Sequence, residues 1–220
     1  MDLLPESQRK FLEEATSQYR KSLEGSPAEE FLQRRGLDSL ATQEVVDRFR
    51  LGYVDDGSEI RHERFRGKLA IPYLRWSPER KWSVVAIRFR CVEDHVCQGH
   101  PKYLSAPGDR PRLYNTPALL QPVDKIGIAE GELDAVTATA CGIPTVGVAG
   151  SGMWKPWFVP PFEGYREVLI FADGDEAGTK LADDVAATLP NARVIQSPDG
   201  YDVNSLVNER GRQYFIERLR

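Results

Sequence analysis

From Asp124 onward, short apolar segments alternate with segments of helical period, and no other feature of the chain constrains the fold as strongly. Strands are predicted at 125–129, 144–150, 167–172 and 192–196, and helices at 132–141, 176–189 and 212–219. Strands that alternate with helices form a parallel sheet covered by helices. In such sheets, ligands bind beyond the carboxyl ends of the strands. The second half of the chain should therefore carry a site at that edge.

The beginning of the chain has the pattern of a small helical unit. Apolar residues recur at helical spacing over 6–24, and the pattern stops at Gly25. Ser26 followed by Pro27 is a typical helix start, and Thr42 is a candidate N-cap for a third helix.

The next part of the chain has the pattern of a β-hairpin. Segments 68–76 and 82–90 are rich in Val, Ile, Trp and Phe, and 77–80 is predicted to be the turn between them. Arg88 and Arg90 alternate with apolar residues, so both should project from one face of a strand. We predict a β-rich module with a basic surface.

These patterns predict an α/β protein with an α+β N-terminal subdomain and an α/β subdomain whose largely parallel sheet is covered by helices. The predicted boundaries are 1–122 for the N-terminal subdomain, 123–206 for the α/β subdomain and 207–220 for a C-terminal helix.

The charges are segregated along the chain. The net charge is −4, yet residues 60–112 hold twelve Lys and Arg against five Asp and Glu, a balance of +7. Residues 123–206 hold five Lys and Arg against thirteen Asp and Glu, a balance of −8. This pattern favours a polyanion partner for the first segment and metal cations for the second. Chance segregation in solvated surface is the alternative.

The composition is that of an ordinary soluble globular protein, with 41% hydrophobic and 28% charged residues. No apolar segment is long enough to span a bilayer. The N-terminus lacks the basic start and apolar centre of a signal peptide, and three cysteines without a framework spacing favour a reducing compartment. We expect a cytoplasmic protein with no membrane partner, in the host cytoplasm if a phage encodes it.

Acidic residues directly follow three of the predicted strands. They are Glu130, Glu132 and Asp134, then Asp173 and Asp175, then Asp199 and Asp202. Because the carboxyl ends of parallel strands meet at one edge, these carboxylates should share a crevice, where only a cation offsets their repulsion. Oxygen ligands favour Mg²⁺ or Mn²⁺ over zinc. Any one acidic element alone would be an ordinary loop or helix start, but three at one edge favour a metal site.

Two acidic motifs resemble a known signature. EGELD (130–134) followed by DGDEAG (173–178) resembles the signature of the TOPRIM fold, which DnaG-type primases share with topoisomerases and some nucleases. Five further segments are similar to primase segments: FRLGYV, RFRGKLAIPY, HPKYLSAP, RLYNTPALL and SPDGYDVNSLV. The similarity covers residues 28–210 in order, so the chain resembles the catalytic core of a bacterial DnaG-type primase.

The resemblance implies a nucleotidyltransferase that makes RNA primers on single-stranded DNA during replication. By position, it implies Glu130, Asp134, Asp173 and Asp175 as catalytic residues, and Glu130, Asp173, Asp175 and Asp202 as ligands of Mg²⁺ or Mn²⁺. It implies contacts with template or nucleotide phosphates for six basic residues, Arg66, Arg88, Arg90, Lys102, Arg110 and Arg112. The implied partners are a single-stranded DNA template and ribonucleoside triphosphates. A replicative helicase and a separate template-recognition protein are further candidates.

The chain departs from the primase pattern in two respects. Primases usually carry an N-terminal zinc-binding domain and a C-terminal helicase-binding domain, so we expect a minimal, phage-like version that lacks both. The primase D-P-D is replaced by Asp202-Val203-Asn204, which should weaken any metal site at the third position.

Two further patterns in the chain are weaker. Cys91, His95, Cys97 and His100 lie within ten residues, but their spacing is irregular for a structural zinc site, and zinc is not expected. Trp154 and Trp157 could stack on a base, but packing within an apolar loop is the preferred interpretation.

Three functions stay open at this point, and the primase is the leading one. A TOPRIM metal-dependent nuclease would use the same carboxylates, but the basic module and HPKYLSAP favour the primase. A non-catalytic single-stranded-DNA-binding or replisome accessory protein is the third; the intact acidic motifs argue against it, and the missing accessory domains keep it open.

Overall fold

The computed structural model describes residues 4–37, 47–57, 60–76, 81–93, 99 and 101–220. The chain forms two compact units, Met1–Arg110 and Pro111–Arg220. In the part of the chain that is described, no helix is both long and apolar enough to cross a membrane. The first part of the predicted helix after Thr42, up to residue 46, and the predicted turn at 77–80 lie outside the described residues. The last part of that helix, 47–49, is helical, and Phe49 is buried as predicted.

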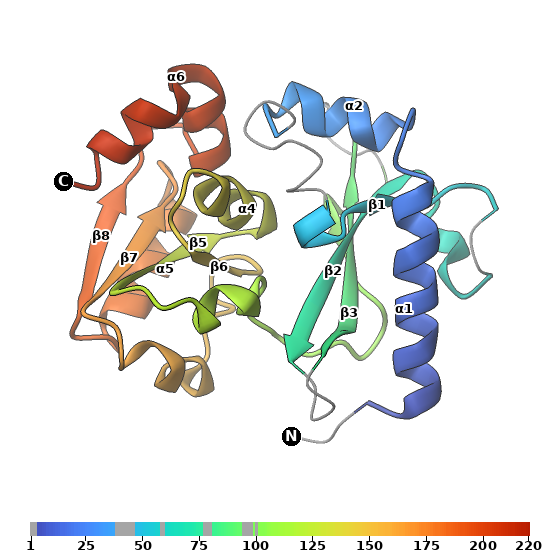
Figure 1. The fold of residues 1–220 in the computed structure, drawn as a ribbon. Helices are drawn as coiled ribbons and strands as arrows, with labels where there is room; N and C mark the ends of the chain where they lie inside the picture. Colours follow the sequence, from blue (N-terminus) through green and yellow to red (C-terminus); the bar gives the residue numbers. More distant parts are fainter. Residues whose placement is uncertain (1–3, 38–46, 58–59, 77–80, 94–98, 100) are drawn as a thin grey trace. The chain divides into compact units, whose positions relative to one another are not determined.

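The first unit is built on a four-stranded antiparallel sheet with the order β1-β2-β3-β4 (Figure 1). The strands are β1 (Gly52–Tyr53), β2 (Lys68–Trp76), β3 (Trp82–Cys91) and β4 (Tyr103–Leu104). The helices are α1 (Glu6–Lys21) and α2 (Pro27–Arg34), with a 3₁₀ helix at Ile60–Phe65. The Ser26 side chain caps α2 by accepting a hydrogen bond from the Glu29 amide, as the Ser-Pro start predicts.

The core of the first unit lies between α1 and the sheet. Leu12, Ala15 and Tyr19 recur at helical spacing and are buried in one cluster with residues of β2 and β3. The rings of Phe65 and Phe89 stack with their centroids 3.8 Å apart. The apolar stripe of α1 therefore faces the sheet and orients the helix on it.

The second unit has a four-stranded, fully parallel sheet with the order β6-β5-β7-β8. The strands are β5 (Lys125–Glu130), β6 (Thr145–Val148), β7 (Glu167–Ala172) and β8 (Ala192–Gln196). The helices are α4 (Glu132–Ala140), α5 (Glu176–Ala186) and α6 (Val203–Glu217), and 3₁₀ helices occupy Thr116–Leu120, Pro156–Phe158 and Pro160–Phe162. The strand order reverses between β5 and β7, which are neighbours in the sheet although β6 lies between them in sequence.

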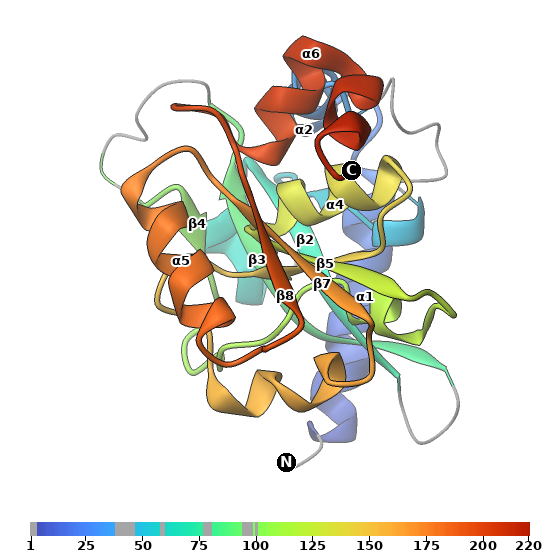
Figure 2. The same cartoon turned by 90° about the vertical axis from the view of Figure 1, so that its left-hand side faces the viewer.

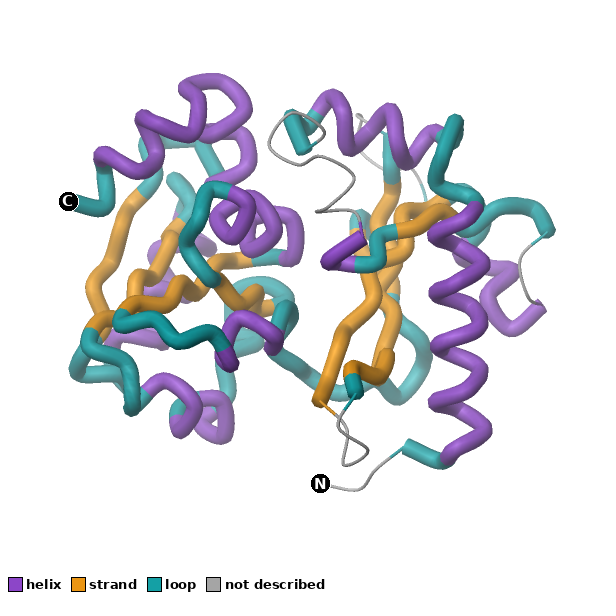
Figure 3. Tube along the Cα trace, in the orientation of Figure 1, coloured by secondary structure: helices purple, strands orange, loops and turns teal. Residues whose placement is uncertain are grey.

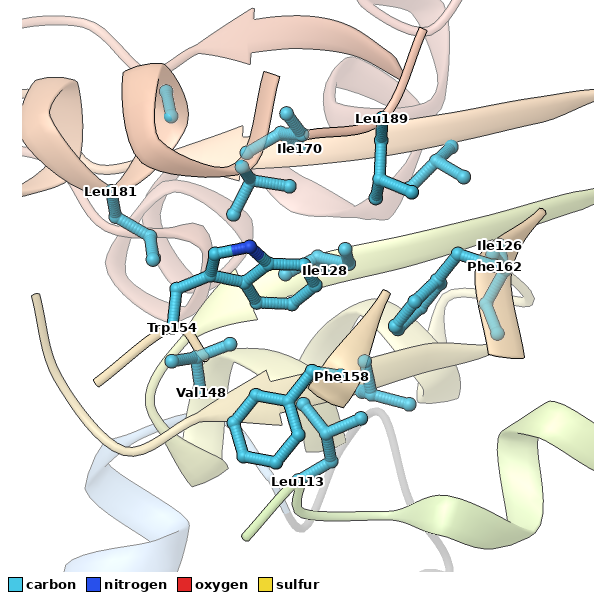
Figure 4. Close-up of a cluster of buried hydrophobic side chains, with 14 of the residues drawn as sticks. Leu113, Ile126, Ile128, Val148, Trp154, Phe158, Phe162, Ile170, Leu181 and Leu189 are labelled. Carbon is cyan, nitrogen blue, oxygen red and sulfur yellow. The ribbon is translucent and has the colours of Figure 1, made fainter. Parts of the chain in front are cut away.

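Helices cover both faces of this parallel sheet, with α5 on one face and α4 and α6 on the other (Figures 2 and 3). On the α5 face, Ile128 and Ile170 pack against Leu181 and the indole of Trp154 (Figure 4). Trp154 is 8% exposed and donates to the Thr188 hydroxyl, whereas Trp157 is 59% exposed. Packing is therefore the role of Trp154 in this structure.

On the opposite face, the ring of Phe171 lies against Phe215 of α6, with the centroids 5.2 Å apart. Gly127 of β5 makes room for Phe171, because a Cβ added at Gly127 would lie 2.6 Å from the Phe171 ring and 2.3 Å from the Thr145 hydroxyl. The glycine in β5 therefore leaves space for the ring of Phe171 in the neighbouring strand β7.

The α/β class, the parallel sheet and a helix from Arg212 were predicted correctly. An additional helical segment that begins at Val203 was not predicted: α6 consists of two helices that meet at a kink at Gly211, where φ is 83°, and the predicted helix is the second of them. Asp202 and Ser205 form a capping box that starts α6 earlier than the apolar period indicates.

The two units divide at Arg110–Pro111, whereas the predicted boundary lies at 122–123. In the segment between these two points, Tyr114 forms a β-bridge with Gly147, and Leu113 and Ala118 are buried in the core of the second unit. The predicted boundary was placed where the hydrophobic period changes, and that period does not indicate that the segment before it packs on the second unit.

Substitution of Gly127 by Ala should lower the free energy of unfolding by about 1–3 kcal/mol, because the added methyl group overpacks the space that Phe171 and Thr145 occupy. Urea denaturation followed by circular dichroism measures the change. Gly164→Ala is the matched control, since no described atom lies within 4 Å of its added Cβ. An equal loss in both variants would contradict the packing role of Gly127.

Candidate functional site

All four strands of the second unit are parallel, so their carboxyl ends lie at one edge of the sheet, the carboxyl edge. Glu130 is the last residue of β5, and Asp173 follows β7 directly. Asp202 ends the turn that follows β8 and precedes α6. The topology therefore brings the three acidic elements of the sequence to the same edge.

The turn after β7 is bonded to the turn after β8. The Gly174 amide donates to the Tyr201 carbonyl at 2.8 Å, and the Gly200 amide donates to the Gly174 carbonyl at 3.0 Å. A Cβ at Gly174 would lie 1.9 Å from the Pro198 carbonyl oxygen, so only glycine permits this approach. These contacts place the segment that bears Asp202 beside the segment that bears Asp173 and Asp175.

Glu130 is a partly buried carboxylate at this edge whose surroundings raise its pKa. Its Oε1 accepts a hydrogen bond from the Ser151 amide at 2.9 Å, while its Oε2 is buried and has no hydrogen-bond partner among the described residues. Burial raises the pKa of Glu130, the Ser151 bond opposes this shift, and the charge of Asp175 adds to it. The surroundings of Glu130 therefore disfavour its ionised form, and a nearby cation would favour that form again.

Asp175 and Asp202 are both helix N-caps. Asp175 Oδ1 accepts from the Gly178 amide at 2.8 Å at the start of α5, and Asp202 Oδ1 accepts from the Ser205 amide at 2.6 Å at the start of α6. A capping bond uses one of two carboxylate oxygens. The cap therefore orients each carboxylate without consuming its whole capacity to accept bonds or bind a cation.

Asp134 joins two helices. It is 7% exposed, and its Oδ1 accepts a hydrogen bond from the backbone amide of Asn204 at 2.9 Å. The side chain of Asn204 is 1% exposed and donates to the Thr137 hydroxyl at 2.9 Å. Asp134 and Asn204 thus tie the start of α6 to α4, a role that the sequence pattern did not indicate for either residue.

The six basic residues predicted to contact phosphates lie in different surroundings. Arg88 and Arg90 share a face of β3, as predicted, with guanidinium carbons 4.5 Å and 5.5 Å from the centroid of the Tyr103 ring. Arg90, however, is only 3% exposed and lies over Phe31 of α2 at 4.3 Å. Arg90 is therefore part of the packing between α2 and the sheet, not of an exposed basic surface.

The other basic residues are more accessible. Lys102 and Arg110 are exposed, and Arg66 is half-buried beside Glu63, with 3.4 Å between Nη1 and the carboxylate. Arg112 is half-buried and belongs to the second unit. Contact of these residues with nucleic acid stays a prediction.

The described residues contain no group of three or more His, Cys, Asp and Glu side chains that is arranged to hold a metal ion. The chemistry of the carboxyl edge nevertheless fits a divalent cation, because its donors are carboxylate oxygens and one of them, Glu130 Oε2, is buried without a bond among those residues. Of the four residues considered for zinc, Cys91 is buried in β3, and His95, Cys97 and His100 lie outside the described residues.

Ser151 was not among the predicted site residues, although its amide is bonded to Glu130. Its signal was present in Gly150-Ser151-Gly152, a serine between two glycines directly after a strand. Such a segment places a backbone amide, and not a side chain, at the site, so the residue type at position 151 does not indicate its role.

The second unit is similar to a known domain family. Residues 125–213 match the family model described as the Toprim domain. Gene 57 protein of Mycobacterium phage D29 is 58% identical over 155 residues, which are 70% of this chain and 99% of that protein. A DNA primase of Pseudomonas putida is 28% identical over 207 residues, which are 86% of this chain. The chain spans only 30% of the length of that primase.

Two solved structures establish the fold across both units. A DNA primase domain from Pseudomonas aeruginosa has a TM-score of 0.76 at 23% identity, with 96% of this chain and 77% of that chain covered. A DnaG primase catalytic domain bound to single-stranded DNA has a TM-score of 0.75 at 22% identity, with the same coverage. The fold of this chain is that of the DnaG catalytic core.

Glu130→Gln should make the protein more stable at pH 7 but not at pH 4. The folded state raises the pKa of Glu130 above its ordinary value of 4.5, so it binds the proton more tightly than the unfolded state does. The stability of the wild type therefore falls, relative to the variant, as pH rises from about 4.5 through the folded pKa. Thermal unfolding midpoints of both proteins from pH 4 to 8, without divalent cations, measure this difference.

Added Mn²⁺ supplies the control for that experiment. If the carboxyl edge binds the cation, Mn²⁺ raises the midpoint of the wild type more than that of Glu130→Gln, because binding to the folded state alone stabilises it. Equal midpoints of the two proteins at every pH would contradict the electrostatic account of Glu130.

Asn204→Asp should destabilise the protein more than Asn204→Ala at pH 7. Asn204→Ala loses the bond to Thr137, at a cost of about 1–3 kcal/mol. Asn204→Asp also buries a carboxylate close to Asp134, and burial raises its pKa, so the extra loss should grow as pH rises and vanish in acid. Denaturation at pH 5 and pH 7.5 checks this, and an Asp variant as stable as wild type would refute the buried-clamp role of Asn204.

Proposed function

We propose a primase function for this chain, which belongs to the Toprim family in the branch of the DnaG-type primase catalytic core. Similarity to DnaG primases in both sequence and fold supports a primase-type activity. The finer proposal is metal-dependent synthesis of short RNA primers on single-stranded DNA. The observation that carries it is the meeting of Glu130, the Asp173–Asp175 turn and the Asp202 turn at one sheet edge.

Four carboxylates are the proposed cation ligands: Glu130, Asp173, Asp175 and Asp202. When bound there, Mg²⁺ or Mn²⁺ would lower the pKa of the attacking 3′-hydroxyl and neutralise charge on the pyrophosphate leaving group. Asp175 and Asp202 are oriented for this by their capping bonds, and Glu130 by the Ser151 amide. Glu130 is proposed to serve either as a cation ligand or as the proton acceptor for the 3′-hydroxyl. Asp134 is proposed to act by holding α6, and with it Asp202, in place.

Single-stranded DNA is the proposed template. One similar DnaG catalytic domain was solved bound to single-stranded DNA, and the segment of this chain with a balance of +7 lies mostly in the first unit. Among the predicted phosphate contacts, Lys102 and Arg110 are the best candidates because they are exposed. Ribonucleoside triphosphates are the second proposed substrate.

The test is incubation of the purified protein with single-stranded DNA, labelled ribonucleoside triphosphates and Mg²⁺ or Mn²⁺. Wild type should produce short RNA, and Asp173→Ala should lower the yield at least a hundredfold because it removes a proposed cation ligand. Asp183→Ala is the matched control, since Asp183 is exposed on α5, and it should remain active.

The other outcomes select other functions. Degradation of the template without incorporation of ribonucleotides would select a Toprim nuclease. DNA binding without either reaction would select a non-catalytic accessory protein. Primer synthesis that survives Asp173→Ala would remove the carboxyl edge as the catalytic site.

A further inference from the structure

The strands β2 and β3 of the first unit carry two tryptophans where they approach their shared turn. Trp76 is the last residue of β2 and is paired with Trp82, the first residue of β3. Their rings meet edge to face, with the centroids 5.2 Å apart. Such a cross-strand pair stabilises the end of a hairpin. The pair does not account for the exposure of Trp76, which is 46% accessible to solvent.

A cleft of about 420 Å³ lies beside this pair, between the first half of α1 and the start of β3 (Figure 1). Trp82 forms part of its wall. Its volume is within the range of sites that take a small ligand or a few side chains. The charged residues that line it are Glu6, Arg9, Lys10, Glu13 and Lys81.

Glu13 adds little negative charge to the cleft, because both of its carboxylate oxygens are bonded. Its Oε1 accepts a hydrogen bond from the Val84 amide at 2.7 Å. Its Oε2 accepts one from Arg50 Nη1 at 3.1 Å, so the charge of Arg50 offsets that of the carboxylate.

The remaining charges leave the cleft positive. Arg9 and Lys81 together exceed Glu6 by one positive charge. Lys10 lies 3.8 Å from Glu14, and both side chains are mostly exposed. Such a surface pair contributes little energy, so Lys10 can turn to a negatively charged ligand at small cost. The cleft therefore combines exposed aromatic surface with an excess of cations.

We propose that this cleft is a docking site for an acidic segment of a partner protein, which places an aromatic side chain against Trp76 and Trp82. Aromatic side chains are enriched in the buried centres of protein interfaces, and cations around them select acidic partners. The docking site goes beyond the proposed primase function and uses none of the residues of the carboxyl edge.

The position and the charges of the cleft favour a peptide over nucleic acid. Ile87 and Phe89 of β3 are buried in the core that α1 covers. Because neighbouring residues of a strand point to opposite faces, Arg88 and Arg90 belong to the other face of the sheet. The cleft therefore lies away from these two predicted phosphate contacts. Glu6 in its wall would repel a continuous row of phosphates, whereas a peptide can place its few carboxylates on the cations.

The experiment follows the tryptophan indole N–H signals by two-dimensional NMR. The chain has four tryptophans, and loss of one signal in Trp76→Phe and in Trp82→Phe assigns the two that matter. The probe is a synthetic peptide with a central phenylalanine flanked by aspartates. It should shift the signals of Trp76 and Trp82 and leave that of Trp154, which is buried in the core of the second unit. A peptide with lysines in place of the aspartates should shift neither.

Variants separate the charges of the cleft from its aromatic surface. Lys10→Gln combined with Lys81→Gln should weaken binding of the acidic peptide about fivefold to tenfold, since each exposed cation contributes modestly. Lys180→Gln is the control, because Lys180 is exposed on α5 and pairs with Asp184. Trp76→Ala should weaken binding about tenfold. If Trp76→Ala lowers the unfolding midpoint, the lysine variants carry the test, because both lysines are exposed.

Three results would overturn the proposal. The first is the absence of any shift of the Trp76 and Trp82 signals when the acidic peptide is added to the wild type. The second is equal affinity for the acidic and the lysine peptide, which would remove the role of charge. The third is a shift of both signals by a single-stranded oligonucleotide that the acidic peptide does not reproduce, which would make the cleft a nucleic-acid site.

Discussion

The contact between the turns after β7 and β8 is the constraint on which the rest of the carboxyl edge depends. Two backbone hydrogen bonds join the two turns, and the missing side chain at Gly174 lets them approach more closely than any other residue would allow. Through this contact, the register of the sheet determines where Asp175 caps α5 and where Asp202 caps α6. The pairing of β7 with β8 therefore determines how the carboxylates of Asp175 and Asp202 are arranged.

The two edges of the same parallel sheet have opposite electrostatics. At the amino edge, Glu167 of β7 accepts from Lys125 of β5 and from Arg193 of β8, each at 2.5 Å, and these bonds lower its pKa. At the carboxyl edge, Glu130 receives one backbone amide and the repulsion of Asp175, and its pKa is raised. Glu167, which joins strands, is thus paired with two basic side chains, whereas Glu130 Oε2 has no hydrogen-bond partner among the described residues. This difference fits the cation site proposed for the carboxyl edge.

Features that follow from hydrophobic period and chain topology could be predicted from the sequence. The four parallel strands and the meeting of Glu130 with the Asp173 turn follow from apolar alternation and from the geometry of parallel sheets. Features that depend on tertiary packing could not. The burial of Arg90 in β3 depends on Phe31, which reaches it from helix α2. The same limit applies to Asn204. In the sequence it stands where primases have an acidic residue, and only the structure shows that its side chain donates a hydrogen bond to Thr137. The helical segment from Val203 was missed for a local reason, because capping bonds between Asp202 and Ser205 mark its start and the apolar period does not.

The strand order has a consequence for how the chain folds during synthesis. The central strand β5 pairs with β7, which begins 37 residues after β5 ends, so the middle of the sheet cannot form until residue 172 has left the ribosome. The turn that locks Gly174 comes later still, with Tyr201. Pairing of β5 with β7 brings Glu130 and Asp175 to one edge, whereas the segment that bears Asp202 can join them only after Tyr201 has been synthesised. The carboxyl edge is therefore completed by the last part of the chain to leave the ribosome.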